Sequence, residues 1–582
     1  MTISQQGSIN TTSQVVPDIL IQIVPPALNL NGVPTNVLGI VGTATWGPVN
    51  SPTTAGGQPD ATQKFGKLQN RKYDLGTAVY TASLQGAGNF KLVRVTDGTD
   101  TAASTSFSQT AAGSVAVVNG GSGHSVGNVL TLTGGATVTV SSVTSGTITA
   151  VTLTNPGTYA TIPSNPVAQT ATTGSGTGAT FNLTFPTGLT LNARYTGTTG
   201  NTLVATLSAG TAAGSTKLTI SLPGQQPEVY DNILGSGSAL FAALANAVNQ
   251  GTGFLRGLSQ LVTAATGPAT GAPANGTYSF SGGTDGANNV TAATLVGQDI
   301  TPRKGMYALR GTGCSVAMLA DADDPGQWTL QNAYGLSEGT YMIATSPAGD
   351  TITNFASSVA TAGVDSYGIK LLLGDYCLIS DTVNNGIQRL VSPQGFLSGK
   401  LANLSPEQSA LNKPLSGIIA TQKTQQNQQY TNADLQQLAL ARGDVITNPI
   451  PAGQIFGSRL GLNSSSNAGI ADDNYPRLTN YIASTLNAGM GKYIGQVQSA
   501  AVQAQARATL DNFLRNMFQQ NMIQAWKVVL DATNNPQSRA SIGYMQADVK
   551  VQYLSIIRYF LVNMENGQTV VIANNTPTAA FT

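Results

Sequence analysis

The sequence is poor in charge, and this scarcity already limits what the protein does. Only 9% of its 582 residues are Asp, Glu, Lys or Arg, against about 25% in an ordinary soluble protein. The net charge is +1 and there is no block of basic residues, which argues against direct binding of nucleic acid. Because little like-charge repulsion opposes contact between copies, such a surface favours self-association.

Histidine and cysteine are almost absent. Cys314 and Cys377 are the only cysteines, which excludes a disulfide framework and a CxxC metal site and predicts two buried thiols. The only histidine, His124, lies within residues 123–127 (GHSVG), which match the GxSxG pattern of α/β-hydrolases. That mechanism needs a second histidine as general base. We therefore expect a turn at GHSVG, and no enzyme activity, cofactor or metal.

Three further short motifs favour structural roles. Residues 442–444 (RGD) match an adhesion motif, but a turn or strand end is the preferred interpretation. Residues 395–400 (GFLSGK) are one residue short of a phosphate-binding loop and lack its Ser or Thr. Residues 321–324 contain three aspartates without the rest of a calcium loop, so a helix N-cap or turn is expected.

Long hydrophobic runs are also missing. The first residues (MTISQQGSINTT) have neither the basic nor the apolar region of a signal peptide. The apolar stretch 19–30 is broken by Pro25 and Pro26 and is too short to cross a bilayer. The sequence thus predicts a protein that is soluble when made, without membrane insertion.

The chain is long enough for several domains, and its first hundred residues have an α/β pattern. Residues 33–50 contain a strand (VLGIVGTA), residues 74–85 have helical spacing of apolar residues, and residues 90–95 (FKLVRV) predict a second strand. Strands resume at 216–222, 314–319, 341–344 and 376–380, with helices at 241–248 and 351–362. This alternation predicts α/β layers.

Residues 101–193 contain no charged residue at all. Thr and Val alternate in 137–140 and 148–153, and turn signals recur about every 10 to 15 residues. That pattern is typical of an all-β sandwich or barrel, whereas disorder usually comes with high net charge. We predict a compact β module inserted into an α/β domain.

The last third is more helical. Apolar stripes run from Leu478 to Met490 and from Leu510 to Phe518, and they are expected to be core rather than contact surface. Strand patterns return at 547–562.

Each end of the chain carries a strand-like apolar segment that has no evident partner. An isolated strand needs a sheet edge to satisfy its backbone groups, so we expect donation to a neighbouring copy; ordinary disorder or an intramolecular strand is the alternative. The residues concerned are Ile19, Leu20, Ile21, Ile23, Val24, Thr569, Val570, Val571 and Ile572.

Several blocks, in this order, resemble contractile tail sheath proteins of phages and injection systems. The resemblance covers residues 30–100 and 190–562; its blocks are 32–35 (GVPT), 41–44 (VGTA), 47–49 (GPV), 65–66 (FG), 78–79 (AV), 92–95 (LVRV), 195–201 (YTGTTGN), 228–232 (EVYDN), 282–286 (GGTDG), the helix pair 475–494 and 505–524, and the strands at 547–562. Two features depart from it: an apolar arm (ILIQIV) replaces the usual acidic one, and residues 457–460 read GSRL where a G-R-T block is usual.

The resemblance implies a multidomain α/β and α+β fold: a discontinuous α/β sheath core with an inserted all-β module and extended terminal arms. The expected divisions are an arm (1–28), a first α/β core segment (29–105), the β module as surface decoration (106–187), a second β-rich domain (188–285), a returning α/β core segment (286–430), an inner domain facing tube and neighbours (431–564) and a second arm (565–582).

The implied function is that of a virion tail component assembled in the host bacterial cytoplasm. Hexameric rings would stack as a helix around an inner tail tube protein, between baseplate and tail terminator proteins, and contract to drive the tube through the bacterial envelope. The alternative is a receptor-binding or decorating virion protein, and the uncharged β module supports it.

Overall fold

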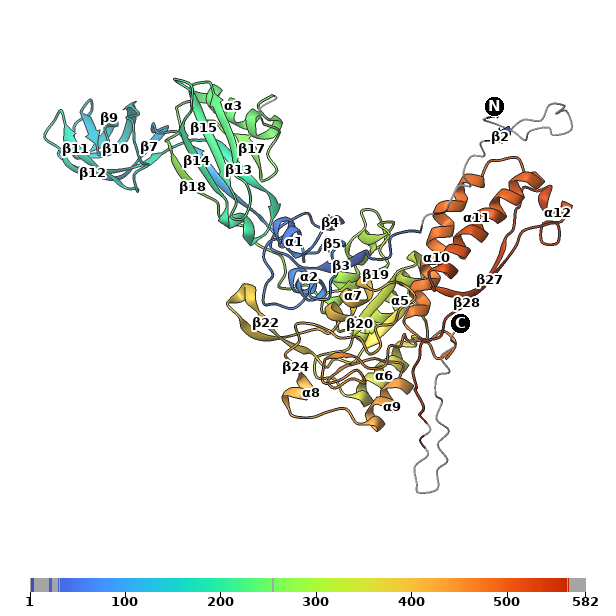
Figure 1. Ribbon diagram of the computed structural model, residues 1–582. Helices are drawn as coiled ribbons and strands as arrows, with labels where there is room; N and C mark the ends of the chain where they lie inside the picture. Colours follow the sequence, from blue (N-terminus) through green and yellow to red (C-terminus); the bar gives the residue numbers. More distant parts are fainter. Residues whose placement is uncertain are drawn as a thin grey trace, which may run out of the picture. The chain divides into compact units, whose positions relative to one another are not determined.

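The structure, a computed structural model, describes residues 2–4, 20–22, 30, 32–253, 256–562 and 564 (Figure 1). It divides into two compact units. The main unit comprises Gly32–Pro406 and Ala410–Leu486. The terminal unit comprises Met1–Asn31, Glu407–Ser409 and Asn487–Thr582.

A six-stranded sheet forms the centre of the main unit, in the order β21-β20-β19-β3-β5-β4. All neighbours are parallel except the edge strand β4, which runs antiparallel to β5. The strands are β3 (Leu38–Gly42), β4 (Thr53–Ala55), β5 (Phe90–Arg94), β19 (Val316–Leu319), β20 (Tyr341–Thr345) and β21 (Ile369–Leu372). Strands β3, β19, β20 and β21 are buried at every residue, as expected where both faces of a parallel sheet are covered.

Helices cover both faces of this sheet (Figure 1). Leu38 and Ile40 point into one core with Phe396, whereas Val41 points into the other with Phe355, which is the two-residue alternation of a strand. The first core includes α1 (Gln58–Phe65), α2 (Leu75–Ser83) and α7 (Gln394–Asn403); the second includes α4 (Ala292–Val296), α5 (Trp328–Glu338), α6 (Ile352–Ala362) and α9 (Asn432–Leu440).

Side-chain caps fix where several of these helices begin. The carboxylate of Asp74 accepts a hydrogen bond from Thr77 N, and the hydroxyls of Thr351 and Thr431 cap α6 and α9 in the same way. The helices predicted at 74–85 and 351–362 and the strands predicted at 90–95 and 341–344 are confirmed within a few residues.

Between β5 and α4 the chain builds three further sheets. The β-rich region contains β17-β13-β6 and β16-β15-β14-β18 around a core that includes Phe107, Tyr230 and Phe241. Its elements are β6 (Ala102–Ser108), β13 (Thr187–Thr196), β14 (Val204–Ala209), β15 (Thr216–Ser221), β16 (Glu228–Ile233), α3 (Gly237–Gln250), β17 (Val262–Thr266) and β18 (Gly276–Ser279).

The third of these sheets consists entirely of the charge-free segment. Its order is β10-β9-β8-β11-β12-β7, and it has its own core around Leu130, Val138 and Phe181. The strands are β7 (Ser114–Ser122), β8 (Val129–Leu132), β9 (Thr137–Thr144), β10 (Thr147–Asn155), β11 (Val167–Thr172) and β12 (Thr177–Thr184). The β structure predicted for this segment is therefore correct.

Smaller elements complete the main unit. They are β22 (Cys377–Asp381), β23 (Ile387–Val391), β24 (Ala420–Thr421), α8 (Gln422–Gln425), β25 (Ile446–Thr447), β26 (Gly457–Ser458) and most of α10 (Asn474–Met490). Both cysteines are free and buried, as predicted.

The terminal unit contains α11 (Ala500–Gln519), β27 (Ile523–Val529), α12 (Gln537–Ala540) and β28 (Asp548–Tyr553), together with β1 (Thr2–Ser4) and β2 (Leu20–Gln22). Helices α10 and α11 confirm that the two apolar stripes are helical; Leu478, Ile482, Leu510, Phe513, Leu514 and Met517 are buried as expected, whereas Phe518 is 46% exposed. The strand predicted at 547–562 is wrong beyond Tyr553: residues 554–562 have no regular structure, because among the described residues no further strand pairs with them.

Candidate functional site: the two-stranded sheet of the terminal unit

Strands β27 and β28 form an antiparallel sheet of only two strands, so within the described chain both outer edges are open. Two strands alone are marginally stable in water, and open edges present unpaired N–H and C=O groups to any further strand. A further strand that paired with either edge would therefore stabilise this sheet.

One face of the sheet is held by α11. The indole of Trp526 lies 5.4 Å from the ring of Phe518, and its Nε1 donates a hydrogen bond to Asp511 Oδ1 at 3.3 Å. The hydroxyl of Ser499 caps the start of α11 by accepting from Val502 N. The helix thus fixes the sheet without covering its opposite face.

A run of exposed apolar side chains follows β28. Their relative exposures lie between 41% and 90%, the highest being that of Tyr559. Large apolar groups gathered in one segment mark an interaction surface rather than a solvated loop. The residues are Leu554, Ile557, Tyr559, Phe560, Leu561, Val562 and Met564.

The structure places only some of the predicted arm strands. Residues Leu20–Gln22 form β2, which pairs in parallel with Thr2–Ser4 of the same chain, as in the intramolecular alternative; these two strands form a sheet of their own. Ile19, Ile23, Val24 and Thr569, Val570, Val571, Ile572 lie outside the described residues. Donation of either arm to a neighbouring copy stays a prediction.

Behind the first arm the chain is anchored in the terminal unit. Leu30 is 8% exposed and packs directly on Gly489, where an added Cβ would lie 1.9 Å from Leu30 Cδ1. The close contact holds Leu30 against α10.

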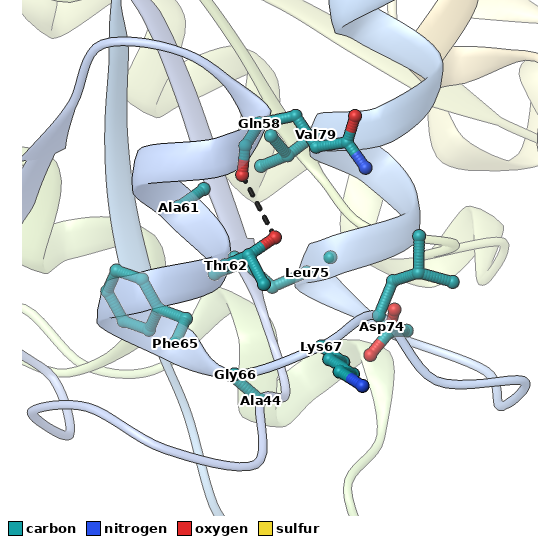
Figure 2. Close-up of a pocket in the computed structure, with 12 residues that line it drawn as sticks. Ala44, Gln58, Ala61, Thr62, Phe65, Gly66, Lys67, Asp74, Leu75 and Val79 are labelled. Atoms are coloured by element: carbon teal, nitrogen blue, oxygen red, sulfur yellow. Dashed lines mark hydrogen bonds between the residues drawn. The ribbon is translucent and has the colours of Figure 1, made fainter. Parts of the chain in front are cut away.

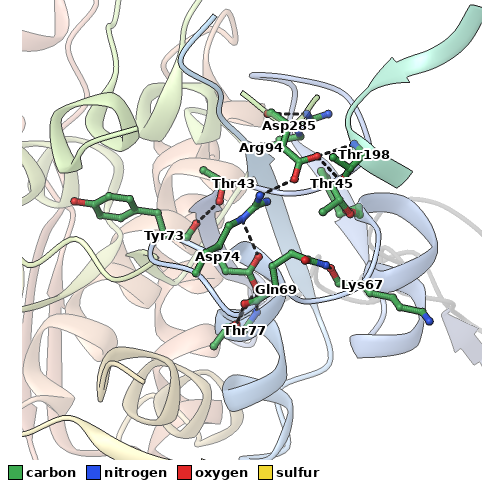
Figure 3. Close-up of polar contacts among 12 residues, drawn as sticks. Thr43, Thr45, Lys67, Gln69, Tyr73, Asp74, Thr77, Arg94, Thr198 and Asp285 are labelled. Atoms are coloured by element: carbon green, nitrogen blue, oxygen red, sulfur yellow. Dashed lines mark hydrogen bonds and ion pairs between the residues drawn. The ribbon is translucent and has the colours of Figure 1, made fainter. Parts of the chain in front are cut away.

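In the main unit, a polar cluster joins the central sheet to the β-rich region (Figure 3). Asp285 accepts hydrogen bonds from Arg71 Nη1 at 2.6 Å, from Thr198 N at 2.7 Å and from Thr198 Oγ1 at 2.8 Å. The side chain of Arg94, which is fully buried, donates to the carbonyls of Gly47, Thr196 and Asp285. Arg94 and Asp285 therefore connect the end of β5, where the chain leaves the central sheet, with the loop after β13 and with the segment after β18, where the chain returns.

Burial has an electrostatic consequence in this joint. It lowers the pKa of Arg94 to about 10, against the opposing influence of Asp100 and Asp285. Gly197 also belongs here: its φ is +125°, and an added Cβ would lie 2.0 Å from Thr45 O. The joint is closely packed, which favours a fixed connection over a flexible linker.

The hollow between α1 and α2 is too small for a ligand (Figure 2). Its volume is about 10 Å³, roughly the space of one water molecule. Gln58 and Thr62 are linked across one turn of α1, since Thr62 Oγ1 donates to Gln58 O. Nothing in this arrangement suggests chemistry.

The remaining motifs have structural roles. His124 is buried without a hydrogen-bond partner on either ring nitrogen, in a segment that has no acidic residue. Asp444 of the RGD motif is fully buried, and Arg442 adopts a left-handed turn, with a φ of +61°. Asp324 caps a short helical turn by accepting from Gly326 N. The turn and cap predictions are thus confirmed.

The GFLSGK segment lies inside α7. Its glycines allow two helices to approach closely: a Cβ on Gly395 would lie 2.0 Å from Thr81 Oγ1, and a Cβ on Gly399 would lie 2.5 Å from the Ala82 Cα. Over the described ranges no group of three or more His, Cys, Asp or Glu residues is placed to hold a metal ion. No helix among the described residues is long and apolar enough to cross a membrane.

No protein-family model and no curated protein matches the sequence. Solved structures do match. The sheath tail protein from Listeria innocua aligns with a TM-score of 0.52 at 11% identity, over 90% of this chain and 96% of that chain. The sheath tail protein from Desulfitobacterium hafniense aligns with a TM-score of 0.50 at 11% identity, over 89% and 94%. The resemblance found in the sequence is confirmed at the level of the fold: this mixed α/β chain has the fold of the tail sheath proteins.

Proposed function

We propose that this chain is the structural subunit of a contractile tail sheath. Copies polymerise as stacked hexameric rings around an inner tail tube, between baseplate and terminator proteins, and contraction drives the tube through the bacterial envelope. The subunit belongs to a virion or injection-system tail assembled in the bacterial cytoplasm, and it catalyses no reaction of its own.

The observation that carries the proposal is the incomplete sheet of the terminal unit. Among the residues that the structure describes, β27 and β28 leave two edges open, and seven large apolar side chains stay exposed in the segment directly after β28. A strand and an apolar surface from another copy satisfy both features at once. Because donor and acceptor surfaces differ, the contact is heterologous and propagates as an open helix. The likeness of the fold to tail sheath proteins supports the same conclusion.

In this proposal, contraction is a change from one packing of nearly rigid subunits to another. The strand links act as tethers while the domains rotate, and the two packings differ in the apolar area they bury. At about 25 cal/mol per Å², a few hundred additional Å² per subunit amounts to several kcal/mol. Summed over a long polymer, this drives contraction without nucleotide hydrolysis.

Negative-stain imaging of the purified protein tests the proposal. We expect striated tubes or stacked rings for the full chain and folded, soluble monomers after deletion of residues 1–24. Compact monomers or trimers of the full chain refute the sheath function and favour the receptor-binding or decorating alternative. Normal tubes from the deletion variant refute the tether role of the first arm.

A further inference from the structure

A pocket of about 190 Å³ lies in the main unit between two walls. One wall is the segment from α8 to the start of α9 (residues 421–435), and the other is the hairpin of β25 and β26 (residues 446–459). The volume corresponds to roughly six water molecules, so it suits a ligand of few atoms. Two cations and no carboxylate are among the residues that line it, which are Thr421, Lys423, Thr424, Gln428, Gln429, Tyr430, Asn432, Leu435, Ile446, Thr447, Asn448, Pro449 and Arg459.

The guanidinium of Arg459 has no hydrogen-bonded or ion-paired partner within the described chain. Its backbone N donates to Val445 O at 3.0 Å, which fixes the residue on the hairpin, and its side chain is half-buried. The carboxylate of Asp444, from the same hairpin, is already bound by Lys370 Nζ at 2.6 Å and by Ser458 Oγ at 2.6 Å. A guanidinium offers five N–H donors in a planar fork. An anion that accepts two of these bonds at once is therefore the natural partner of this side chain.

Lys423 supplies the second cation, from the opposite wall. Its Nζ lies 4.1 Å from the centre of the Tyr430 ring and 4.0 Å from Asp434 Oδ2. The carboxylate of Asp375, which accepts from Lys423 N at 3.0 Å, also interacts with its charge. The charge of Lys423 is thus partly balanced, and the excess positive charge of the pocket comes mainly from Arg459.

Three amide side chains at the rim are available to the same ligand. Gln428, Gln429 and Asn432 are exposed, and their amide groups form no hydrogen bond with any residue that the structure describes. Each amide offers two N–H donors. The pocket therefore combines two cations with unused neutral donors, which is the chemistry that recognises an oxyanion.

We propose that this pocket binds inorganic phosphate or the phosphate group of a small molecule. The fork of Arg459 holds two oxygens of the anion, and Lys423 approaches a third from the opposite wall. A planar carboxylate satisfies the fork but has no oxygen left for the second cation, so an anion with more oxygens fits better. The bound anion ties the exposed segment 425–429 to the hairpin. The site lies within one chain and is independent of the proposed function.

Calorimetric titration of the full chain with inorganic phosphate, at constant ionic strength set with chloride, tests the site. We expect a Kd of about 1 mM. Arg459→Gln should weaken binding by at least about tenfold, because it removes two hydrogen bonds to a charged group, and Lys423→Gln by about threefold. Arg515→Gln is the matched control, since Arg515 is an exposed arginine of α11 that also lacks an ion pair within the described ranges; it should leave binding unchanged.

A rim variant keeps the test sound if the Arg459 variant fails to fold. Gln429→Glu alters only an exposed side chain and places a carboxylate at the pocket, so it should weaken phosphate binding by at least about tenfold. Phosphate should also slow proteolytic cleavage within residues 425–429 of the wild type but not of Arg459→Gln. Absence of binding by the wild type at about 50 mM phosphate, or binding that both variants leave unchanged, overturns the inference. Acetate should bind at least about tenfold more weakly, and equal binding of the two anions overturns the assignment to phosphate.

Discussion

Lys370 Nζ lies 2.6 Å from Asp444 Oδ2, and neither side chain is exposed to solvent. The same ammonium group donates to Leu462 O at 2.9 Å and lies 3.5 Å from Asp473 Oδ2. Burial alone raises the pKa of Asp444, but the charge of Lys370 and the hydrogen bond from Ser458 outweigh it, so the pKa is lowered. The cluster joins the edge strand β21 to the segment that carries β26.

Removal of the ammonium should be costly. Lys370→Met leaves the Asp444 carboxylate buried without its cation and should lower the free energy of unfolding by about 3–5 kcal/mol, measured by chemical denaturation. The exposed pair Lys64–Asp60 has 41% and 36% exposed side chains, so Lys64→Met should cost about 0–1 kcal/mol. Equal costs for the two variants would contradict the importance assigned to burial.

The stability of the main unit should respond to pH through Asp321. Burial and the neighbouring Asp74 raise the pKa of Asp321 from 3.8 to about 6. A raised pKa means that the folded state holds the proton more tightly, so this contribution is present below pH 4 and is lost as the pH rises through 6. Asp321→Asn should therefore stabilise the protein at pH 7 by up to about 3 kcal/mol and have little effect at pH 4.

Thermal unfolding at both pH values, for the wild type and this variant, measures the effect. Asn is well suited to the left-handed backbone of residue 321, whose φ is +51°. A gain that is the same at pH 4 and pH 7 would show that the carboxyl group is not the cause.

The joint shown in Figure 3 should control the connection to the β-rich region. Asp285→Ala removes three hydrogen bonds and leaves the half-buried Arg71 without this partner; we expect a loss of about 2–3 kcal/mol and faster proteolytic cleavage near residues 95–101 and 281–286. Asp231→Ala in β16 also removes hydrogen bonds to a neighbouring loop, those donated by Thr211 N and Oγ1, and should leave cleavage at the joint unchanged. Cleavage rates that change equally in both variants would argue against a specific role for Asp285.

The charge-free sheet should be separable from the rest of the chain. Ser108 of β6 and Thr187 of β13 are register partners in the ladder on which it is inserted, and Gln109 N donates to Pro186 O at 3.0 Å. The ends of the segment 110–186 therefore lie side by side. Replacement of this segment by Asn-Gly, which favours a tight hairpin turn, should preserve folding and tube formation; an unfolded product in circular dichroism would contradict this independence.

The sequence allowed the central sheet to be predicted because its strands are buried on both faces. The run from Leu38 to Gly42 is apolar at nearly every position, and Leu75, Ala78, Val79 and Ala82 mark one face of α2. Strand β27 was not predicted, because only Ile523 and Val528 of its seven residues are buried. A strand in a two-stranded sheet therefore shows little of the alternation between apolar and polar residues that marks a strand in the sequence. The Lys370–Asp444 pair joins residues far apart in the chain, and only the tertiary fold brings them together.

Some features of the candidate site could be anticipated. Apolar arms without a partner were evident from residues 19–24 and 569–572, but the open sheet of the terminal unit was not. The apolar run after Tyr553 suggested more strand, whereas the structure leaves it exposed. The spacing of apolar residues indicates that a segment becomes buried. It does not indicate whether the surface that buries it belongs to the same chain or to another copy.

A cryo-electron microscopy map of tubes assembled from the full chain, at a resolution that traces strands, would show which backbone completes the sheet of the terminal unit. We expect residues 19–24 and 569–572 of other copies to hydrogen-bond to the open edges of β27 and β28. Edges that stay unpaired, or that are closed by strands of the same copy, would contradict the proposed exchange of strands between subunits.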